Sequence, residues 1–111
     1  MCLNDKLINS VKRDKINNAI KYLAQNNSKG VIEKVILFGS CITDECTSQS
    51  DIDVCFVSSY DSSNSDFFNI YGGFSIAADD LCDIVIYDRV NGKLKNEINN
   101  KGVIIYEYTA N

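Results

Sequence analysis

Four short apolar runs, separated by longer polar segments, set the tightest limit on how this chain can fold. Each run is rich in β-branched residues and predicts a strand, at residues 31–40, 50–59, 81–88 and 103–108. Three other segments have helical spacing, at residues 4–27, 67–81 and 89–102. Gly72 and Gly73 weaken the second helix, and its large apolar residues are expected to pack in the core. Residues 40–50 favour one or two helical turns followed by a loop. This alternation predicts an α/β fold, with helices covering a sheet.

Length and charge limit the classes of partner. The 111 residues fit one domain, spanning 1–111. A net charge of −4 counts against binding to polymeric DNA or RNA, whose phosphates attract basic domains, but permits a single nucleotide. No signal peptide or membrane span is visible, and five cysteines without C-x-x-C spacing favour free or buried thiols. We therefore expect a cytoplasmic protein with no membrane partner, and homo-oligomers remain possible.

The absence of histidine narrows the chemistry. Ser-His and Cys-His nucleophile pairs, histidine-ligated metals and a histidine base are all excluded. Carboxylates are then the main reactive groups.

Two carboxylates stand one residue apart inside the second apolar run, at Asp51 and Asp53. Residues i and i+2 of a strand face the same side, roughly 6.5–7 Å apart, so these side chains project together while Ile52, Val54 and Phe56 enter the core. Paired carboxylates repel each other unless a cation bridges them. Oxygen ligands of this kind suit Mg²⁺ or Mn²⁺.

A third carboxylate, Asp83, lies near the start of the third apolar run. If that strand neighbours the second, Asp83 completes a triad able to hold two metal ions roughly 3.5–4 Å apart, as in phosphoryl transfer. Three other acids compete for this role: Asp79, Asp80 and Asp88. Asp83 is preferred because it sits within the apolar run, where an unpaired charge most needs a reason.

A glycine and a serine, Gly39 and Ser40, follow the first strand and open the next segment. Glycine allows a phosphate to approach the backbone closely, and exposed N–H groups with a serine hydroxyl can bind an anion. We expect this turn to hold the phosphates of a triphosphate. Either motif alone is weak, since Gly-Ser is a common turn and Asp-Ile-Asp could be an exposed strand edge.

The combined pattern resembles the DNA polymerase beta-like nucleotidyltransferase superfamily, and most closely its minimal members. Their signature is Gly-Ser, ten residues, then Asp-x-Asp, which Gly39-Ser40 and Asp51-Ile52-Asp53 match. The apolar "VILF" before the glycine and the ending "NEINNKGVIIYE" are also similar. The third family acid falls on Asp83. The resemblance covers residues 31–107 and implies a palm-like mixed sheet with helices.

The resemblance also implies an activity. It is the transfer of a nucleoside monophosphate, AMP from ATP, to a hydroxyl, with Mg²⁺ (two ions, or Mn²⁺) held by Asp51, Asp53 and Asp83. Asp83 would help to activate the acceptor, and Gly39 and Ser40 would hold the triphosphate. Short members of the family are often antitoxins that add AMP to a tyrosine of a HEPN-domain toxin.

One departure from the family keeps alternatives open. Many members have Ala-Arg-Gly shortly after the Gly-Ser, where this chain has Ile42-Thr43-Asp44. The lost basic residue favours a weaker enzyme or a non-catalytic binding module. A small-molecule acceptor such as an aminoglycoside is another alternative, although its larger enzymes use a second helical domain.

Overall fold

The computed structural model describes residues 10–39, 52–61 and 63–109. Its elements are α1 (Ser10–Asn26), β1 (Lys34–Phe38), β2 (Ile52–Val57), α2 (Ser65–Ala77), β3 (Cys82–Ile86), the 3₁₀ turn η2 (Tyr87–Arg89), α3 (Gly92–Lys101) and β4 (Val103–Glu107). The three longer helices and four strands expected from the sequence are confirmed. The short helical turn expected within residues 40–50 lies outside the described residues.

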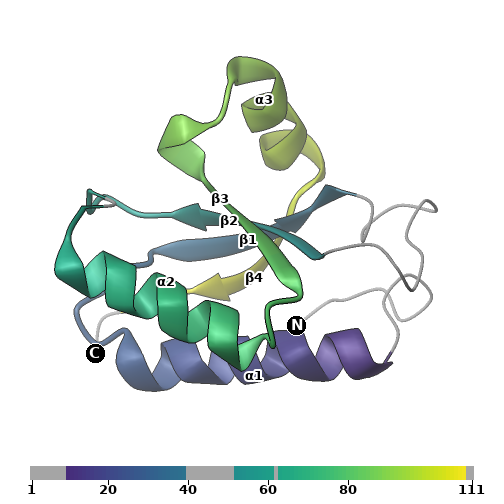
Figure 1. The fold of residues 1–111 in the computed structure, drawn as a ribbon. Coiled ribbons are helices and arrows are strands. Elements are labelled where there is room, and N and C mark those ends of the chain that lie inside the picture. The colour runs from purple at the N-terminus through teal and green to yellow at the C-terminus, as the bar shows by residue number, and fades with distance from the viewer. Residues whose placement is uncertain (1–9, 40–51, 62, 110–111) are drawn as a thin grey trace.

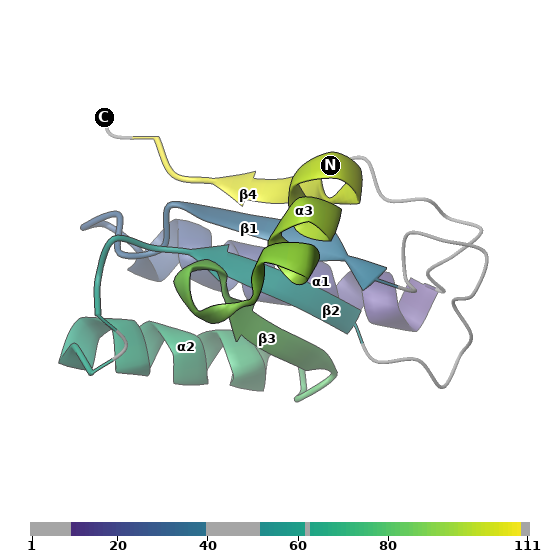
Figure 2. The same ribbon diagram turned by 90° about the horizontal axis from the view of Figure 1, so that it is seen from above.

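The strands form one mixed sheet in the order β3-β2-β1-β4 (Figure 2). β1 pairs antiparallel with both β2 and β4, whereas β2 and β3 are parallel. α2 connects these two parallel strands, as a crossover requires. The condition set for Asp83 is therefore met, because its strand is the direct neighbour of β2.

The helices are divided unequally between the two faces of the sheet (Figure 1). α1 and α2 cover one face and bury a large core, which includes Ile52, Val54 and Phe56 of β2, as the sequence predicted. α3 covers the other face over a small cluster of buried residues: Ile36, Phe38, Cys55 and Ile98. Two of the candidate carboxylates, Asp53 and Asp83, are on this second, thinly covered face.

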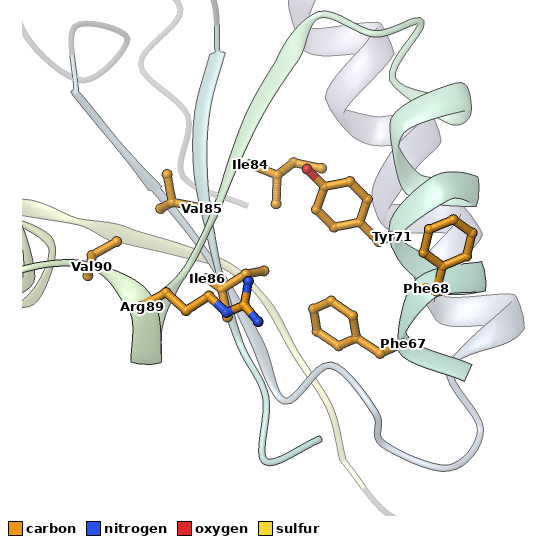
Figure 3. Close-up of a pocket in the computed structure, with 8 residues that line it drawn as sticks. All are labelled: Phe67, Phe68, Tyr71, Ile84, Val85, Ile86, Arg89 and Val90. Atoms are coloured by element: carbon orange, nitrogen blue, oxygen red, sulfur yellow. The ribbon is translucent and has the colours of Figure 1, made fainter. Parts of the chain in front are cut away.

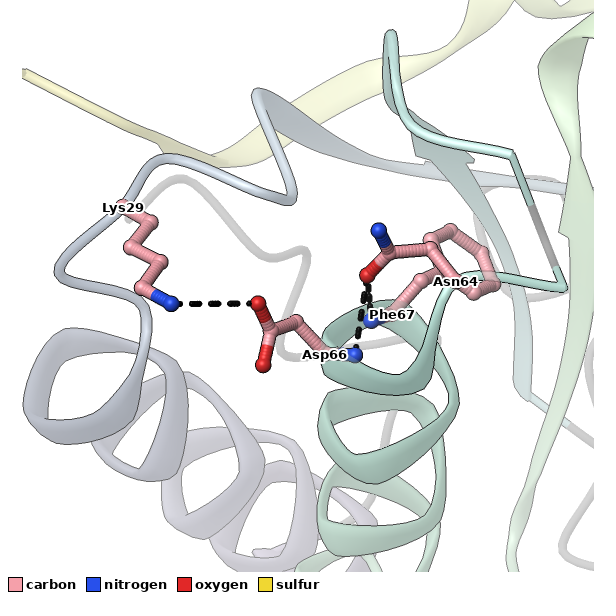
Figure 4. Close-up of polar contacts among 4 residues, drawn as sticks. All are labelled: Lys29, Asn64, Asp66 and Phe67. Carbon is pink, nitrogen blue, oxygen red and sulfur yellow. Dashed lines mark hydrogen bonds and ion pairs between the residues drawn. The ribbon is translucent and has the colours of Figure 1, made fainter.

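Ion pairs join α1 and α2 near both ends, and the two helices run antiparallel. Lys15 approaches Asp79 at 3.3 Å, and Lys29 approaches Asp66 at 3.2 Å (Figure 4). Between these ends, a Cβ at Gly73 would collide with the ring of Tyr22. The sequence suggested that glycine weakens this helix, but Gly73 also allows α1 to approach it closely.

Capping side chains explain where two helices begin. Asn64 accepts hydrogen bonds from the N–H groups of Asp66 and Phe67, so α2 begins at Ser65 rather than at residue 67 (Figure 4). Asn91 accepts from Leu94 N–H, so α3 begins at Gly92 rather than at residue 89. The sequence instead predicts Asn64 in a loop and Asn91 inside a helix.

The first strand is shorter than expected, because a buried asparagine holds the chain in a turn before it. Asn27 is 3% exposed and donates through Nδ2 to the carbonyl of Ile32 at 2.7 Å, while its Oδ1 accepts from the N–H of Ile32 at 3.1 Å. The strand therefore begins at Lys34 instead of residue 31. Among the described residues, no helix is long and apolar enough to cross a membrane.

Candidate functional site

Two of the three candidate carboxylates meet at one end of the sheet. Asp53, near the start of β2, is the register partner of Asp83, near the start of β3. Paired residues of parallel strands face the same side, with backbones about 5 Å apart. That side is the α3 face, because Cys55 and Val85, two residues further along each strand, belong to the α3 cluster. Asp53 is half-buried and Asp83 is exposed.

Gly39 lies directly against Asp53. It follows β1, whose last residue, Phe38, is the register partner of Asp53. The φ of Gly39 is +80°, and a Cβ built on it would collide with Oδ2 of Asp53. Only glycine meets both demands without strain. Gly39, Asp53 and Asp83 therefore form one corner of the molecule, which we call the carboxylate corner.

The remaining candidates, Asp51 and Ser40, lie outside the described residues. The structure consequently does not place the complete set that the sequence predicted. Within the described ranges, no group of three Asp, Glu or Cys side chains is arranged to hold a metal ion. The three competing acids lie outside the strands: Asp79 and Asp80 follow α2 with positive φ, and Asp88 lies in η2.

The donor atoms of the carboxylate corner suit a hard divalent cation. Two carboxylates on adjacent strands, one of them exposed, offer only oxygen ligands, which Mg²⁺ and Mn²⁺ prefer. Their mutual repulsion favours a bound cation. Asp53 and Asp83 would hold the ion, and the sequence position of Asp51 adds a further carboxylate beside Asp53.

Two cysteines near these carboxylates are unsuited to nucleophilic chemistry. Burial, followed by the charge of Asp53, raises the pKa of Cys82 to about 12. Burial, followed by the charge of Asp88, raises the pKa of Cys55 to about 11. Both thiols remain protonated near neutral pH and are free of disulfides, as the sequence predicted.

A groove lies beside β3 that the sequence did not predict. The expectation that all the large apolar residues of α2 pack in the core is wrong for Phe68 and Ile76, which are 70% and 77% exposed. Phe67, Ile70 and Phe74 are buried at helical spacing. Helical spacing in the sequence could have identified the two exposed residues, because positions 68 and 76 fall on a different side of α2 from the buried ones.

Comparison with known proteins identifies the family. The family model described as "Polymerase beta, Nucleotidyltransferase" matches residues 17–111. A crystal structure of a toxin-antitoxin with AMP-PNP has a chain that superposes with a TM-score of 0.61 and 22% identity, over 83% of this chain and 73% of that chain. None of the curated proteins compared with this chain matches it.

Two other structures have the same fold. One contains a tri-AMPylated Shewanella oneidensis HEPN toxin in complex with MNT antitoxin, with a TM-score of 0.57 and 21% identity over 87% of this chain and 73% of that chain. The other is the toxin-antitoxin MntA-HepT, with a TM-score of 0.56 and 20% identity over 85% and 71%. Since the family model spans most of the sequence, this chain belongs to the polymerase beta nucleotidyltransferase family.

Proposed function

We propose that this chain transfers a nucleoside monophosphate, AMP from ATP, to a hydroxyl group of a partner protein, in a reaction that requires Mg²⁺ or Mn²⁺. The observation that carries the proposal is the pairing of Asp53 with Asp83 beside Gly39. Family membership adds the reaction class. The toxin-antitoxin structures with a related fold favour a HEPN-domain toxin as the partner. The resemblance to the minimal members of the family implies a tyrosine as the acceptor.

Each residue of the carboxylate corner has a distinct role in this proposal. Asp53 and Asp83, with Asp51, would hold the metal ions, which would neutralise phosphate charge during transfer. Gly39 and Ser40 bind the triphosphate through backbone N–H groups and the hydroxyl. The acceptor oxygen forms a bond to the α-phosphorus, and the bond from that phosphorus to the pyrophosphate oxygen breaks. Pyrophosphate leaves with the electron pair, and Asp83 takes the hydroxyl proton.

A protein acceptor is favoured over an aminoglycoside, because the solved structures with a related fold that are described above come from toxin-antitoxin pairs.

Labelled ATP tests the proposal. The chain is incubated with α-labelled ATP, Mg²⁺ and the protein encoded by the neighbouring gene, and label on that protein is measured. We expect labelling that falls at least 100-fold in Asp53→Asn, because transition-state charge is no longer neutralised. Asp61→Asn is the matched control, since this exposed carboxylate lies beyond the opposite end of β2 and its loss should leave labelling unchanged.

Two outcomes contradict the proposal. Equal labelling by the wild type and Asp53→Asn would assign the transfer to another site or protein. Tight partner binding without labelling would instead support the non-catalytic alternative.

A further inference from the structure

An apolar groove runs between α2 and the outer strand β3 (Figure 3). Its volume is about 490 Å³. The floor and walls are aromatic and aliphatic, with one cation at the rim, and are formed by Phe67, Phe68, Tyr71, Ile84, Val85, Ile86, Arg89 and Val90. Such a lining favours apolar side chains over a phosphate group.

The exposed side of α2 extends this groove. Phe68 and Ile76 are eight residues apart and therefore share one side of the helix. Gly72 lies between them, and a Cβ at this position would meet no other atom. A partner could approach closely here. Apolar side chains this exposed on one element indicate a contact surface rather than core.

The outer edge of β3 can accept another strand. Within the part of the chain that the structure describes, β3 pairs with β2 alone, at the end of the sheet (Figure 2). The backbone groups on its outer side therefore suit an extended segment that adds to the sheet, with alternate side chains entering pockets.

Successive side chains of β3 point to opposite faces of the sheet, so this strand borders both the groove and the carboxylate corner. Ile84 and Ile86 contact the α1–α2 core, whereas Val85 belongs to the α3 face, as does Asp83 by strand alternation. In an added strand, one set of side chains would face the groove and the other set would face Asp83. An acceptor residue beside Asp83 would then have apolar neighbours on the groove side.

Charge favours a basic segment over a second copy of this chain. Three acids on or next to β3 are exposed: Asp80, Asp83 and Asp88. Two copies joined along β3 would bring both acidic sets together, and each copy has a net charge of −4. A segment with lysine or arginine on the Asp83 side would compensate these charges.

We infer that the groove and the β3 edge bind the acceptor segment of the partner as an added strand. The segment is extended, with the acceptor hydroxyl facing Asp83, apolar residues at the positions next to it and basic residues two positions away. This inference rests on the proposed function, which it deepens by naming the acceptor surface.

Two synthetic peptides test the predicted alternation. The first is Thr-Val-Lys-Val-Tyr-Val-Lys-Val-Thr, in which the tyrosine shares a face with both lysines. The second exchanges the tyrosine with the valine before it, which keeps the composition but turns the hydroxyl toward the groove. With labelled ATP and Mg²⁺, we expect at least tenfold more label on the first peptide.

Amide chemical shifts and hydrogen exchange provide a readout that is independent of transfer. The first peptide should shift and protect amides of β3 and shift those near Phe68. Phe68→Asp should lower peptide affinity and labelling at least tenfold without unfolding the chain, because this ring is 70% exposed. Ile104→Asp, at an exposed residue of β4 on the opposite edge, is the matched control and should change neither.

The possible failures are distinguishable. Labelling that Phe68→Asp leaves unchanged would refute the acceptor groove and leave the transfer intact. Peptide binding at β3 with no labelling of any acceptor would refute the transfer, and with it the acceptor role. Hydrogen-exchange protection of the β3 amides that rises with protein concentration, without peptide, would show that a second copy binds this edge. Chemical-shift changes of Phe68 and Tyr71 on adding ATP alone would show that the nucleotide base binds the groove. Either result would overturn the inference.

Discussion

The two faces of the sheet differ in what they bury. Among the residues that the structure describes, the α1–α2 face has fifteen buried residues in one continuous cluster, including Phe56, whose ring packs edge-to-face on Phe74 at 4.9 Å. The same described residues give the α3 face four buried residues, and on this face Asp53 and Asp83 lie at the end of the strands. The first face therefore supplies most of the apolar stabilisation.

This asymmetry shows how a short chain can carry charged groups. Carboxylates are costly to bury, and here they lie on the α3 face, which few buried side chains cover. Alternate residues of the same strands point to the opposite face and pack in the larger core. Ile52 and Val54 fix the position of Asp53 from the opposite side, since both are fully buried. Strand alternation thus separates the buried apolar side chains from the candidate carboxylates.

Replacing one buried isoleucine on each face of the sheet by alanine gives the largest expected difference in the free energy of unfolding. Ile16→Ala on the α1 side should lower the free energy of unfolding by about 4 kcal/mol, because the surrounding cluster cannot collapse into the cavity. Ile98→Ala, at an equally buried residue of α3, should cost about 2 kcal/mol, because its smaller cluster can relax. Urea unfolding of both variants measures the difference. Equal losses would contradict the asymmetry.

Gly39→Ala should affect both stability and activity. The residue has a φ of +80°, and its new Cβ would collide with the Asp53 carboxylate, so we expect a loss of about 2 kcal/mol. Nucleotide transfer should fall more than in proportion to the folded fraction, because Asp53 is displaced. Thermal unfolding and transfer are measured on the same sample. A variant of normal stability and activity would show that Asp53 does not depend on this glycine.

Stability should fall as the pH rises above 9, because of Cys55 and Cys82. Their ordinary pKa is 9.0, and folding raises it to about 11 and about 12. Below pH 9 both thiols are protonated in the folded and unfolded chain; above pH 9 only the unfolded chain releases these protons. We expect a loss of about 2–3 kcal/mol between pH 8 and pH 10. Unfolding of the Cys55→Ala/Cys82→Ala variant should show a smaller change over this range, and an identical change would refute the assignment.

The adjacent glycines of α2 give the smallest predicted effect. Gly72→Ala should stabilise the chain by about 0.5–1 kcal/mol, because its Cβ meets open space and alanine favours helix. Gly73→Ala should destabilise by about 1 kcal/mol, because the ring of Tyr22 must move. In a Tyr22→Ala background the two substitutions should become equivalent. A persisting difference would place its cause elsewhere in α2.

Sequence periodicity predicted which elements form but not how they pair. Strand and helix patterns are local, so β1–β4 were visible as apolar runs. The placement of β4 beside β1 depends on packing between distant segments, which periodicity does not encode. Helix starts at Ser65 and Gly92 were missed because Asn64 and Asn91 resemble loop residues until their capping hydrogen bonds are formed.

The candidate site was predictable to the extent that strand geometry controls it. Alternation placed Asp53 opposite Ile52 and Val54, and the apolar run around Asp83 indicated a strand that proved to be adjacent. The contact between Gly39 and Asp53 was not predictable, because it depends on the register of β1 with β2. The groove was missed because aromatic composition indicated core without regard to helical phase.

Paramagnetic broadening by Mn²⁺ tests the central claim most directly. Mn²⁺ is added with ATP to the isotope-labelled chain, and the loss of each amide signal is measured. We predict the strongest broadening around Gly39, Asp53 and Asp83, and its loss in a variant carrying both Asp53→Asn and Asp83→Asn. Broadening centred on Asp61, Asp79 or Asp80, or the same broadening in the double variant, would show that the carboxylate corner does not hold the metal.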